Sequence, residues 1–154
     1  MEYEYYQNAN ESVKPNTYTY TEVIKTFCNN ASINNLGKAN ELLNQMILSM
    51  DSSMYPSNYT FHVLLNACCI FGKEDFESNG NEGTTNKRLR VACEIVLKSL
   101  AQYRQIAPKM NDEPDEYIYG AMFRAYSCLI ANSFFDSDDI QVFMMNELKQ
   151  CCVN

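Results

Sequence analysis

The chain has 154 residues, of which 46% are apolar, five are glycine, four are proline and none is tryptophan. This length supports one domain with its own core, and the scarcity of turn-forming residues favours helices over a fold of many strands. The formal net charge of −7 weighs against a strongly basic nucleic-acid surface, because acidic groups repel phosphate. No apolar run approaches the ~20 residues of a membrane span, and the acidic N-terminus resembles neither a signal peptide nor a transit peptide.

The seven cysteines are predicted to be free thiols in a reducing compartment. Their number is odd, no Cys-x-x-Cys motif occurs, and most stand beside apolar residues in helical patterns. In such positions a free cysteine behaves as a small hydrophobic residue. A disulfide framework and a zinc site are therefore both disfavoured.

The first helices of three predicted repeats follow one pattern. Pro15, Pro56 and Pro114 are each followed five residues later by an aromatic residue, with a tyrosine two residues before it. Apolar residues three, four and seven positions after the aromatic residue lie with it on one face of an α-helix. A proline followed by Asn, Ser or Asp is also a favourable helix start. The predicted apolar stripes are Tyr20, Val23, Ile24 and Phe27; Phe61, Leu64, Leu65 and Cys68; and Tyr119, Met122, Phe123 and Tyr126.

In chain order, a flexible acidic tail (residues 1–13) precedes a single helical domain (residues 14–153). Each repeat carries a second helix, and polar segments connect the helices. The repeats are predicted at about 14–55, 56–113 and 114–152, the second helices at 40–50, 89–103 and 140–151, and the connections at 29–36 and 106–113, with a mobile loop at 72–86.

These hairpins are predicted to stack on one another. A single helical hairpin cannot bury both of its apolar faces, whereas stacked neighbours can. We therefore predict an all-α fold, an α-solenoid of about three helix-turn-helix repeats, which is near the minimum for stability. No polar capping helix is evident at the C-terminal end, which indicates a truncated chain or one that pairs with a partner or with further repeats.

The first repeat resembles a pentatricopeptide repeat. The resemblance is carried by Pro15-Asn-Thr-Tyr-Thr-Tyr-Thr-Glu-Val-Ile-Lys-Thr-Phe-Cys28 and by Ala39-Asn-Glu-Leu-Leu-Asn-Gln-Met46. The later repeats are similar at Tyr59-Thr-Phe-His-Val-Leu-Leu-Asn-Ala-Cys-Cys69 and at Pro114-Asp-Glu-Tyr-Ile-Tyr119. The resemblance implies a right-handed α-α superhelix that binds single-stranded RNA. It also implies a mitochondrial or plastid protein that belongs to an RNA-processing or translation factor.

The face opposite each apolar stripe is predicted to be exposed and to carry the binding residues. Aromatic rings stack on bases, polar side chains reach base edges, and cations meet phosphates. Two alternatives stay open: the tyrosines pack between neighbouring hairpins, and His62 is an ordinary surface residue. Residues three and four apart share one side of a helix, and the predicted sets are Tyr18, Thr21 and Lys25; Tyr59, His62 and Asn66; and Tyr117, Gly120 and Arg124.

The resemblance also implies which residues recognise bases. In the family they are the residue after the aromatic one and the residue after the next proline. The matching pairs in this chain are Thr21 with Ser57 and His62 with Asp115. Gly120 occupies the corresponding place in the third repeat and has no side chain for that role.

No enzyme chemistry, cofactor or metal is predicted. The single histidine has no assignable catalytic partner, and neither a glycine-rich phosphate loop nor a metal-ligand spacing occurs. The basic run at 87–90 is interpreted as the solvated start of a helix in preference to a phosphate contact. The predicted function is a single-stranded RNA-binding module. The alternative is an α-solenoid scaffold for protein–protein interaction without RNA binding of its own.

Overall fold

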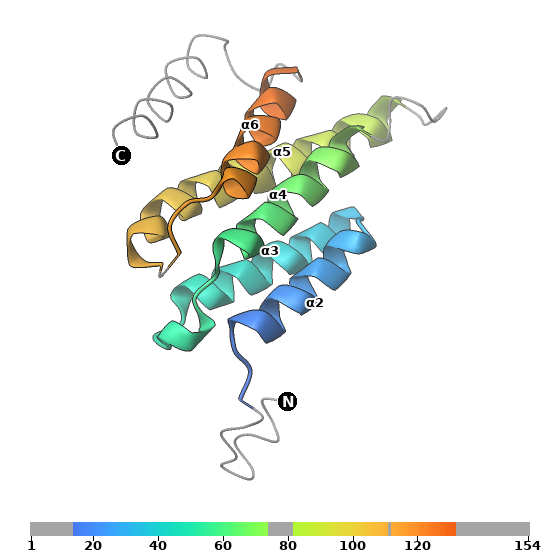
Figure 1. Ribbon diagram of the computed structural model, residues 1–154. Coiled ribbons are helices and arrows are strands. Elements are labelled where there is room, and N and C mark those ends of the chain that lie inside the picture. Colours follow the sequence, from blue (N-terminus) through green and yellow to red (C-terminus); the bar gives the residue numbers. More distant parts are fainter. Residues whose placement is uncertain (1–13, 74–81, 111, 132–154) are drawn as a thin grey trace.

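The computed structural model describes residues 14–73, 82–110 and 112–131, and within these ranges it contains helices and no strand (Figure 1). The prediction of an all-α fold is therefore confirmed. The tail predicted at 1–13 and the helix predicted at 140–151 lie outside the described residues. The α-helices are α2 (Thr17–Asn29), α3 (Ile33–Leu48), α4 (Asn58–Lys73), α5 (Glu82–Ile106) and α6 (Glu116–Ala131), and the short 3₁₀ helices are η2 (Ser52–Met54) and η4 (Ala107–Lys109).

The residue after each of the three prolines caps a helix. The Asn16 side chain accepts a hydrogen bond from the backbone N–H of Thr19 at 3.1 Å. Ser57 Oγ accepts one from the N–H of Thr60 at 3.3 Å, and Asp115 Oδ1 accepts one from the N–H of Ile118 at 2.8 Å. Each bond satisfies an N–H that has no partner inside the helix. The predicted helix starts are thus correct, and their physical basis is a polar cap after the proline.

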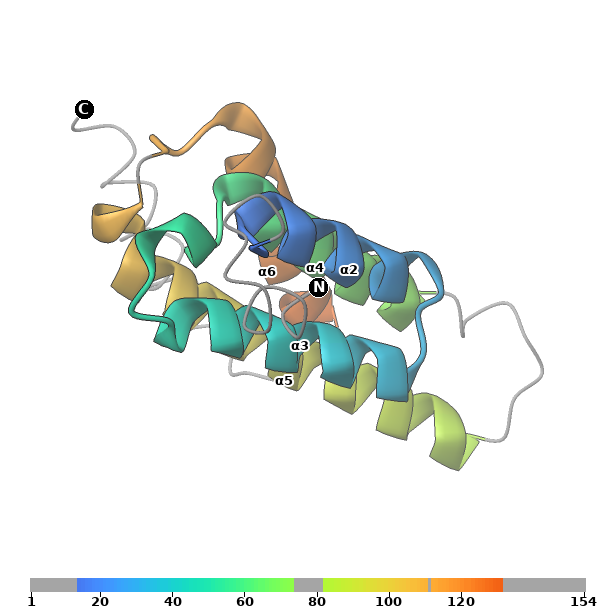
Figure 2. The same cartoon turned by 90° about the horizontal axis from the view of Figure 1, so that it is seen from below.

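The helices form two layers. In one layer α4 lies between α2 and α6, and in the other α5 lies beside α3 (Figures 1 and 2). The chain therefore folds as a hairpin of α2 and α3, a hairpin of α4 and α5, and then α6. This arrangement lets the apolar face of one hairpin be buried against the next.

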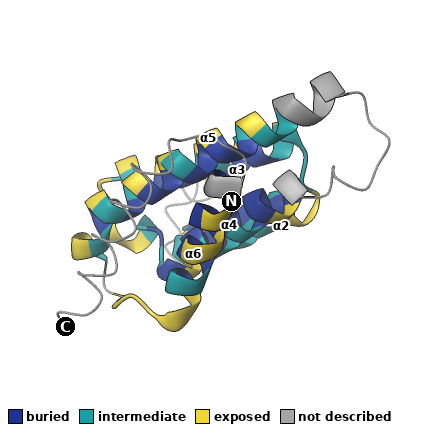
Figure 3. Ribbon diagram, turned by 90° about the horizontal axis from the view of Figure 1, so that it is seen from above, coloured by how far each residue is buried: buried dark blue, intermediate teal, exposed yellow. Residues whose placement is uncertain are grey.

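The core lies between the layers, where the buried residues of each helix meet (Figure 3). Phe61 on α4 is fully buried and meets Tyr103 of α5 edge to face, with 5.1 Å between the ring centroids. Full burial of a side chain of this size stabilises the fold by roughly 1.5–3 kcal/mol. The other fully buried side chains include Ile24, Leu36, Leu43, Met46, Leu64, Leu65 and Ile118.

Two residues of the predicted apolar stripes are not in the core. Val23 is 40% exposed and Phe123 is 41% exposed. Both belong to α2 and α6, which among the described helices of this layer each have α4 on one side only (Figure 1). The stripe of α4, which has a helix on both sides, is buried throughout.

The boundaries of the second helices also differ from the prediction. Helix α3 begins at Ile33, because the Ser32 hydroxyl accepts a hydrogen bond from the N–H of Asn35 at 3.1 Å and starts the helix there. The connection predicted at 29–36 is therefore shorter. Because α3 ends at Leu48, Met50 lies beyond it and is fully exposed rather than on its apolar face.

The second hairpin is longer than predicted in both of its helices. Helix α4 continues to Lys73 and α5 starts at Glu82, so the loop predicted at 72–86 is too long at both ends. Helix α5 also extends to Ile106, beyond the predicted 89–103. Hydrophobic spacing located both helices but not their ends, since polar residues continue each helix past its apolar face.

The described cysteines form no disulfide bond and are buried, as predicted: Cys28, Cys68, Cys69, Cys93 and Cys128. Burial raises the pKa of Cys28 to about 12 and also raises the pKa of Cys68. Such thiols stay protonated near neutral pH, and the thiolate is the reactive form. They therefore act as small apolar residues of the core.

Candidate ligand-binding face

Three tyrosines mark one exposed face of the α2–α4–α6 layer. Each is the second residue of its helix, and the side chains are 73%, 48% and 65% exposed at Tyr18, Tyr59 and Tyr117. Each capping residue lies two positions before its tyrosine. By setting where the helix starts, it also sets the side of the helix on which the ring is exposed. Each tyrosine therefore keeps a large exposed area, although Tyr117 of α6 also contacts the His62 ring of α4.

An aromatic pocket opens between α4 and α6 on this face. Its volume is about 320 Å³, and its lining is formed by Asn58, Tyr59, His62, Asp115 and Tyr117. The His62 ring stacks beside that of Tyr59, with 6.1 Å between centroids and 23° between planes. Tyr117 stands at 82° to His62, with centroids 6.3 Å apart. Two walls of the pocket are therefore flat rings set nearly at right angles.

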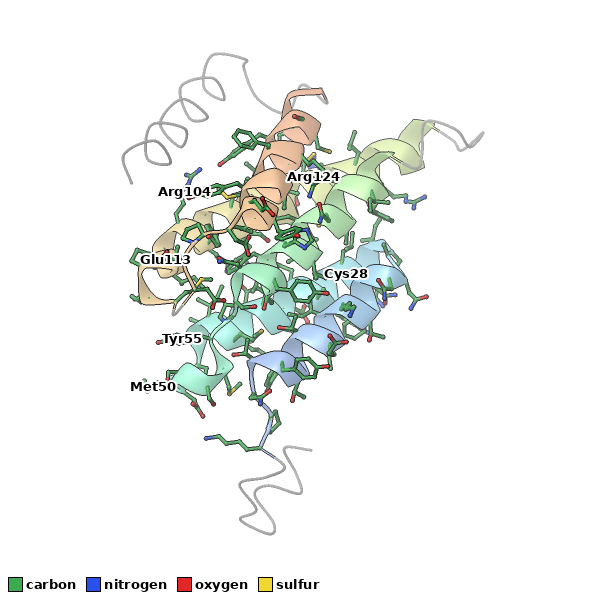
Figure 4. All side chains as sticks on the ribbon, viewed as in Figure 1. Cys28, Met50, Tyr55, Arg104, Glu113 and Arg124 are labelled. Carbon is green, nitrogen blue, oxygen red and sulfur yellow. The ribbon has the colours of Figure 1, made fainter. Side chains whose placement is uncertain are left out.

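Behind His62 runs a polar relay of three side chains from α6 to α4. The Arg124 Nε–H donates to Asn66 Oδ1 at 2.9 Å, and Asn66 Nδ2 donates to His62 Nε2 at 2.8 Å. Arginine can only donate, so the amide oxygen of Asn66 must face it. The amide NH₂ then faces His62, whose Nε2 must be unprotonated to accept. Figure 4 labels Arg124 on α6, on the side toward α4.

The relay holds His62 in its neutral form with the proton on Nδ1. Burial lowers the pKa of His62, the positive charge of Arg124 lowers it further, and Asp115 opposes the shift. Nδ1 is itself buried and has no hydrogen-bond partner among the described residues. In this state Nδ1 is withdrawn from solvent and Nε2 is engaged by Asn66, so His62 lines the pocket as a neutral ring.

Two cations flank the aromatic pocket. Lys25 on α2 forms an ion pair with Glu22 at 3.3 Å, and both Glu22 and the Tyr59 phenol raise its pKa. On α6 the Arg124 guanidinium lies along the helix, and a Cβ added at Gly120 would lie 3.5 Å from it. The predicted sets Tyr59–His62–Asn66 and Tyr117–Gly120–Arg124 thus come together in one place.

Thr21 does not belong to the exposed face, and its prediction as a binding residue is wrong. It is only 4% exposed, because α4 packs over this side of α2. Its hydroxyl lies 2.8 Å from that of the fully buried Thr60 and donates to the carbonyl oxygen of Thr17 at 2.7 Å. A side chain in this position has no route to a ligand on the surface.

Ser57 lies close to Thr21 in space, and both residues contact the hydroxyl of the buried Thr60. Its hydroxyl lies 3.1 Å from that of Thr60, and its N–H donates to the Thr60 hydroxyl at 3.1 Å. Ser57 also borders a second hollow of about 220 Å³, away from the aromatic pocket, beside Tyr55 and Lys109. Of the two predicted recognition pairs, only His62 and Asp115 line the same pocket.

Asn58 and Thr60 are the polar residues of this region that sequence patterns missed. Asn58 is 3% exposed, donates to the carbonyl oxygen of Glu113 at 2.7 Å and accepts from the Tyr103 hydroxyl at 2.9 Å. It forms the inner end of the aromatic pocket and ties it to α5. A polar residue in the first turn of a helix is ordinary in sequence, so neither residue gave a distinctive signal.

The basic run at 87–90 takes no part in the face. The Arg88 guanidinium lies 4.4 Å from the centroid of the Phe71 ring, and Arg90 pairs with Glu94 at 3.0 Å along the same helix. These contacts keep both arginines on the surface of α4 and α5. Because α5 begins at Glu82, the run lies beyond the first turn of the helix, and the prediction that it starts the helix is wrong.

Comparison of this chain with protein families, with curated proteins and with solved structures gives no match. Over the described ranges, no helix combines the length and the apolar character that crossing a bilayer requires. In those same ranges no three side chains of the metal-binding types converge on one point. The geometry of the face itself therefore carries the functional argument.

Proposed function

We propose that this chain is a single-stranded RNA-binding helical-repeat module. The observation that carries the proposal is the exposed row of Tyr18, Tyr59 and Tyr117, which leads into the aromatic pocket and is flanked by Lys25 and Arg124. Rings on which bases stack, next to cations that meet phosphates, are the two elements of a single-strand binding surface.

In this proposal a base lies against the ring of Tyr59 or Tyr117 at the mouth of the aromatic pocket. Stacking on one aromatic side chain contributes about 1–3 kcal/mol per base and tolerates every base, since each has a π-face. Asp115 lies at the same pocket, and its carboxylate can accept a hydrogen bond from an amino or imino group of the base. The phosphates on either side of the base lie toward Lys25 and Arg124.

The two-layered arrangement of hairpins supports a wider form of the proposal. Here the hairpins form part of a right-handed α-α superhelix that resembles a stack of pentatricopeptide repeats. The module would then be part of an RNA-processing or translation factor of a mitochondrion or plastid. Few cations lie on the face and the whole chain has a charge of −7, so we expect modest affinity with a shallow dependence on salt.

The test is the binding of a random single-stranded RNA pool to the full chain at two salt concentrations, followed by fluorescence anisotropy. We expect binding at low salt that weakens as salt rises, and a further loss when Lys25 and Arg124 are both replaced by Gln. The matched control is Leu48→Ala, which removes an exposed apolar side chain from α3, in the other layer. Absence of binding at low salt would contradict the proposal and favour the protein-interaction scaffold.

A further inference from the structure

The polar relay allows only one pattern of donors and acceptors. Arg124 donates, Asn66 accepts on its oxygen and donates from its nitrogen, and His62 accepts at Nε2. If a proton from solvent binds to Nε2, that nitrogen becomes a donor and faces the NH₂ group of Asn66. Two donors then oppose each other, and the hydrogen bond between Asn66 and His62 is lost.

Rotation of the Asn66 amide cannot restore the relay. A rotated amide would offer its oxygen to protonated His62, but its NH₂ group would then face the Nε–H of Arg124. In either orientation of the amide, one of the two bonds is therefore lost in the protonated state. The positive charge acquired by the ring also repels the guanidinium, which already acts on His62 in the neutral state. Both effects favour departure of Arg124 from Asn66.

We propose that the polar relay is a proton-controlled latch on Arg124, in which neutral His62 holds the guanidinium on Asn66 and protonated His62 releases it to an anionic ligand. The ligand chemistry is a phosphodiester of single-stranded RNA, so this inference rests on the proposed function. Asn66 is a positioning residue in the latch, because it acts only through its two neighbours.

The charged groups around His62 set the direction of the response. From α6, Arg124 disfavours the protonated ring and Asp115 favours it. From α2, Lys25 lies beside Tyr59 and is paired with Glu22. Helices α3 and α5 lie in the other layer, and the charged groups that act most on His62 are Arg124 and Asp115 of α6. Burial and Arg124 lower the pKa of His62, so the latch is closed near neutral pH and opens on acidification.

The latch can be tested without RNA. The chain has one histidine, so its ring resonances titrate without overlap in NMR spectra of the full chain. We expect the Arg124 Nε–H resonance to shift and to exchange faster with water along the same titration curve as His62. In Asn66→Leu the two titrations should separate. An Arg124 resonance that ignores the titration of His62 would overturn the latch, whether or not the chain binds RNA.

The second test compares RNA affinity at about pH 7.5 with the affinity at the lower pH at which the NMR titration shows His62 to be protonated. We expect about two- to fivefold tighter binding at the lower pH, the effect of one exposed charge–charge contact. His62→Phe keeps a flat ring and should abolish the difference. The matched control Lys25→Gln should weaken binding at both pH values and leave their ratio intact. A ratio in His62→Phe equal to that of the unmodified chain would overturn the latch.

Discussion

The hydroxyl groups of Thr21 and Thr60 lie 2.8 Å apart in the interface between α2 and α4. Thr21 donates its own proton to the carbonyl oxygen of Thr17, so in this pair Thr60 acts as the donor. The Thr60 oxygen in turn accepts from the N–H of Ser57. A chain of hydroxyl groups therefore connects the cap of α4 to the first turn of α2.

Replacement of Thr60 by Val should destabilise the fold by about 1–3 kcal/mol, because it leaves the Ser57 N–H without its acceptor and removes the buried bond between the Thr60 and Thr21 hydroxyl groups. Urea-induced unfolding of the full chain measures this effect. Thr26→Val is the matched control on α2, since Thr26 is exposed and its hydroxyl bonds only to its own helix at the Glu22 carbonyl. Equal losses in the two variants would show that the buried hydroxyl chain contributes nothing of its own.

Tyr59→Leu should weaken RNA binding by about 1–3 kcal/mol, because the ring on which a base stacks is lost while an apolar side chain remains. Tyr59→Phe keeps the ring and should bind almost as well as the unmodified chain. The two affinities are compared by anisotropy with the same RNA pool. If Tyr59→Phe loses as much as Tyr59→Leu, the phenol group and not the ring makes the contact.

Stability should fall as the pH is lowered below the ordinary pKa of histidine. The pKa of His62 is depressed in the folded chain, so the unfolded chain binds the proton more readily than the folded chain does. The stabilisation is fully present above the pKa that His62 has in the unfolded chain, and it is lost as the pH falls through the lower pKa that His62 has in the folded chain. Unfolding by urea at several pH values measures the slope. In His62→Phe this histidine contribution should vanish, and an unchanged slope would assign the effect to other groups.

Gly120→Ala should stabilise the chain by about 0.5–1 kcal/mol, the usual gain when glycine is replaced inside a helix. The added Cβ would lie 3.5 Å from the Arg124 guanidinium, which is an ordinary contact. Gly37→Ala on α3 is the matched control, because nothing lies within 4 Å of its added Cβ. Thermal unfolding should give similar gains for both. A loss confined to Gly120→Ala would mean that Arg124 needs the space.

The sequence predicted the parts of the fold that depend on neighbouring residues. The caps at Asn16, Ser57 and Asp115 and the apolar stripe of α4 follow from local spacing. The start of α3 was missed because Ser32 lies within a polar run whose residues suit a helix or a loop equally well. Local patterns specify what a segment can form, and the cap decides where it begins.

The candidate site was predictable only in part. Tyr18, Tyr59 and Tyr117 were placed on an exposed face by spacing along each helix. Thr21 was placed there too, because spacing along one helix does not show where a neighbouring helix will cover it. The bond from Arg124 to Asn66 joins residues 58 positions apart. No periodicity within a helix encodes such a contact, so it became visible only with the packing of α6 against α4.

Helix α4 packs against each of the other four described α-helices. Local opening of a helical stack starts at its ends, where few neighbours hold a helix in place. Tyr59, His62 and Asn66 are carried by α4, which has the most neighbours among the described helices, while Tyr18 and Tyr117 stand on the helices beside it. The centre of the candidate face is therefore preorganised. In the proposed function, a base that docks there would meet side chains already fixed in position, with little loss of conformational entropy on binding.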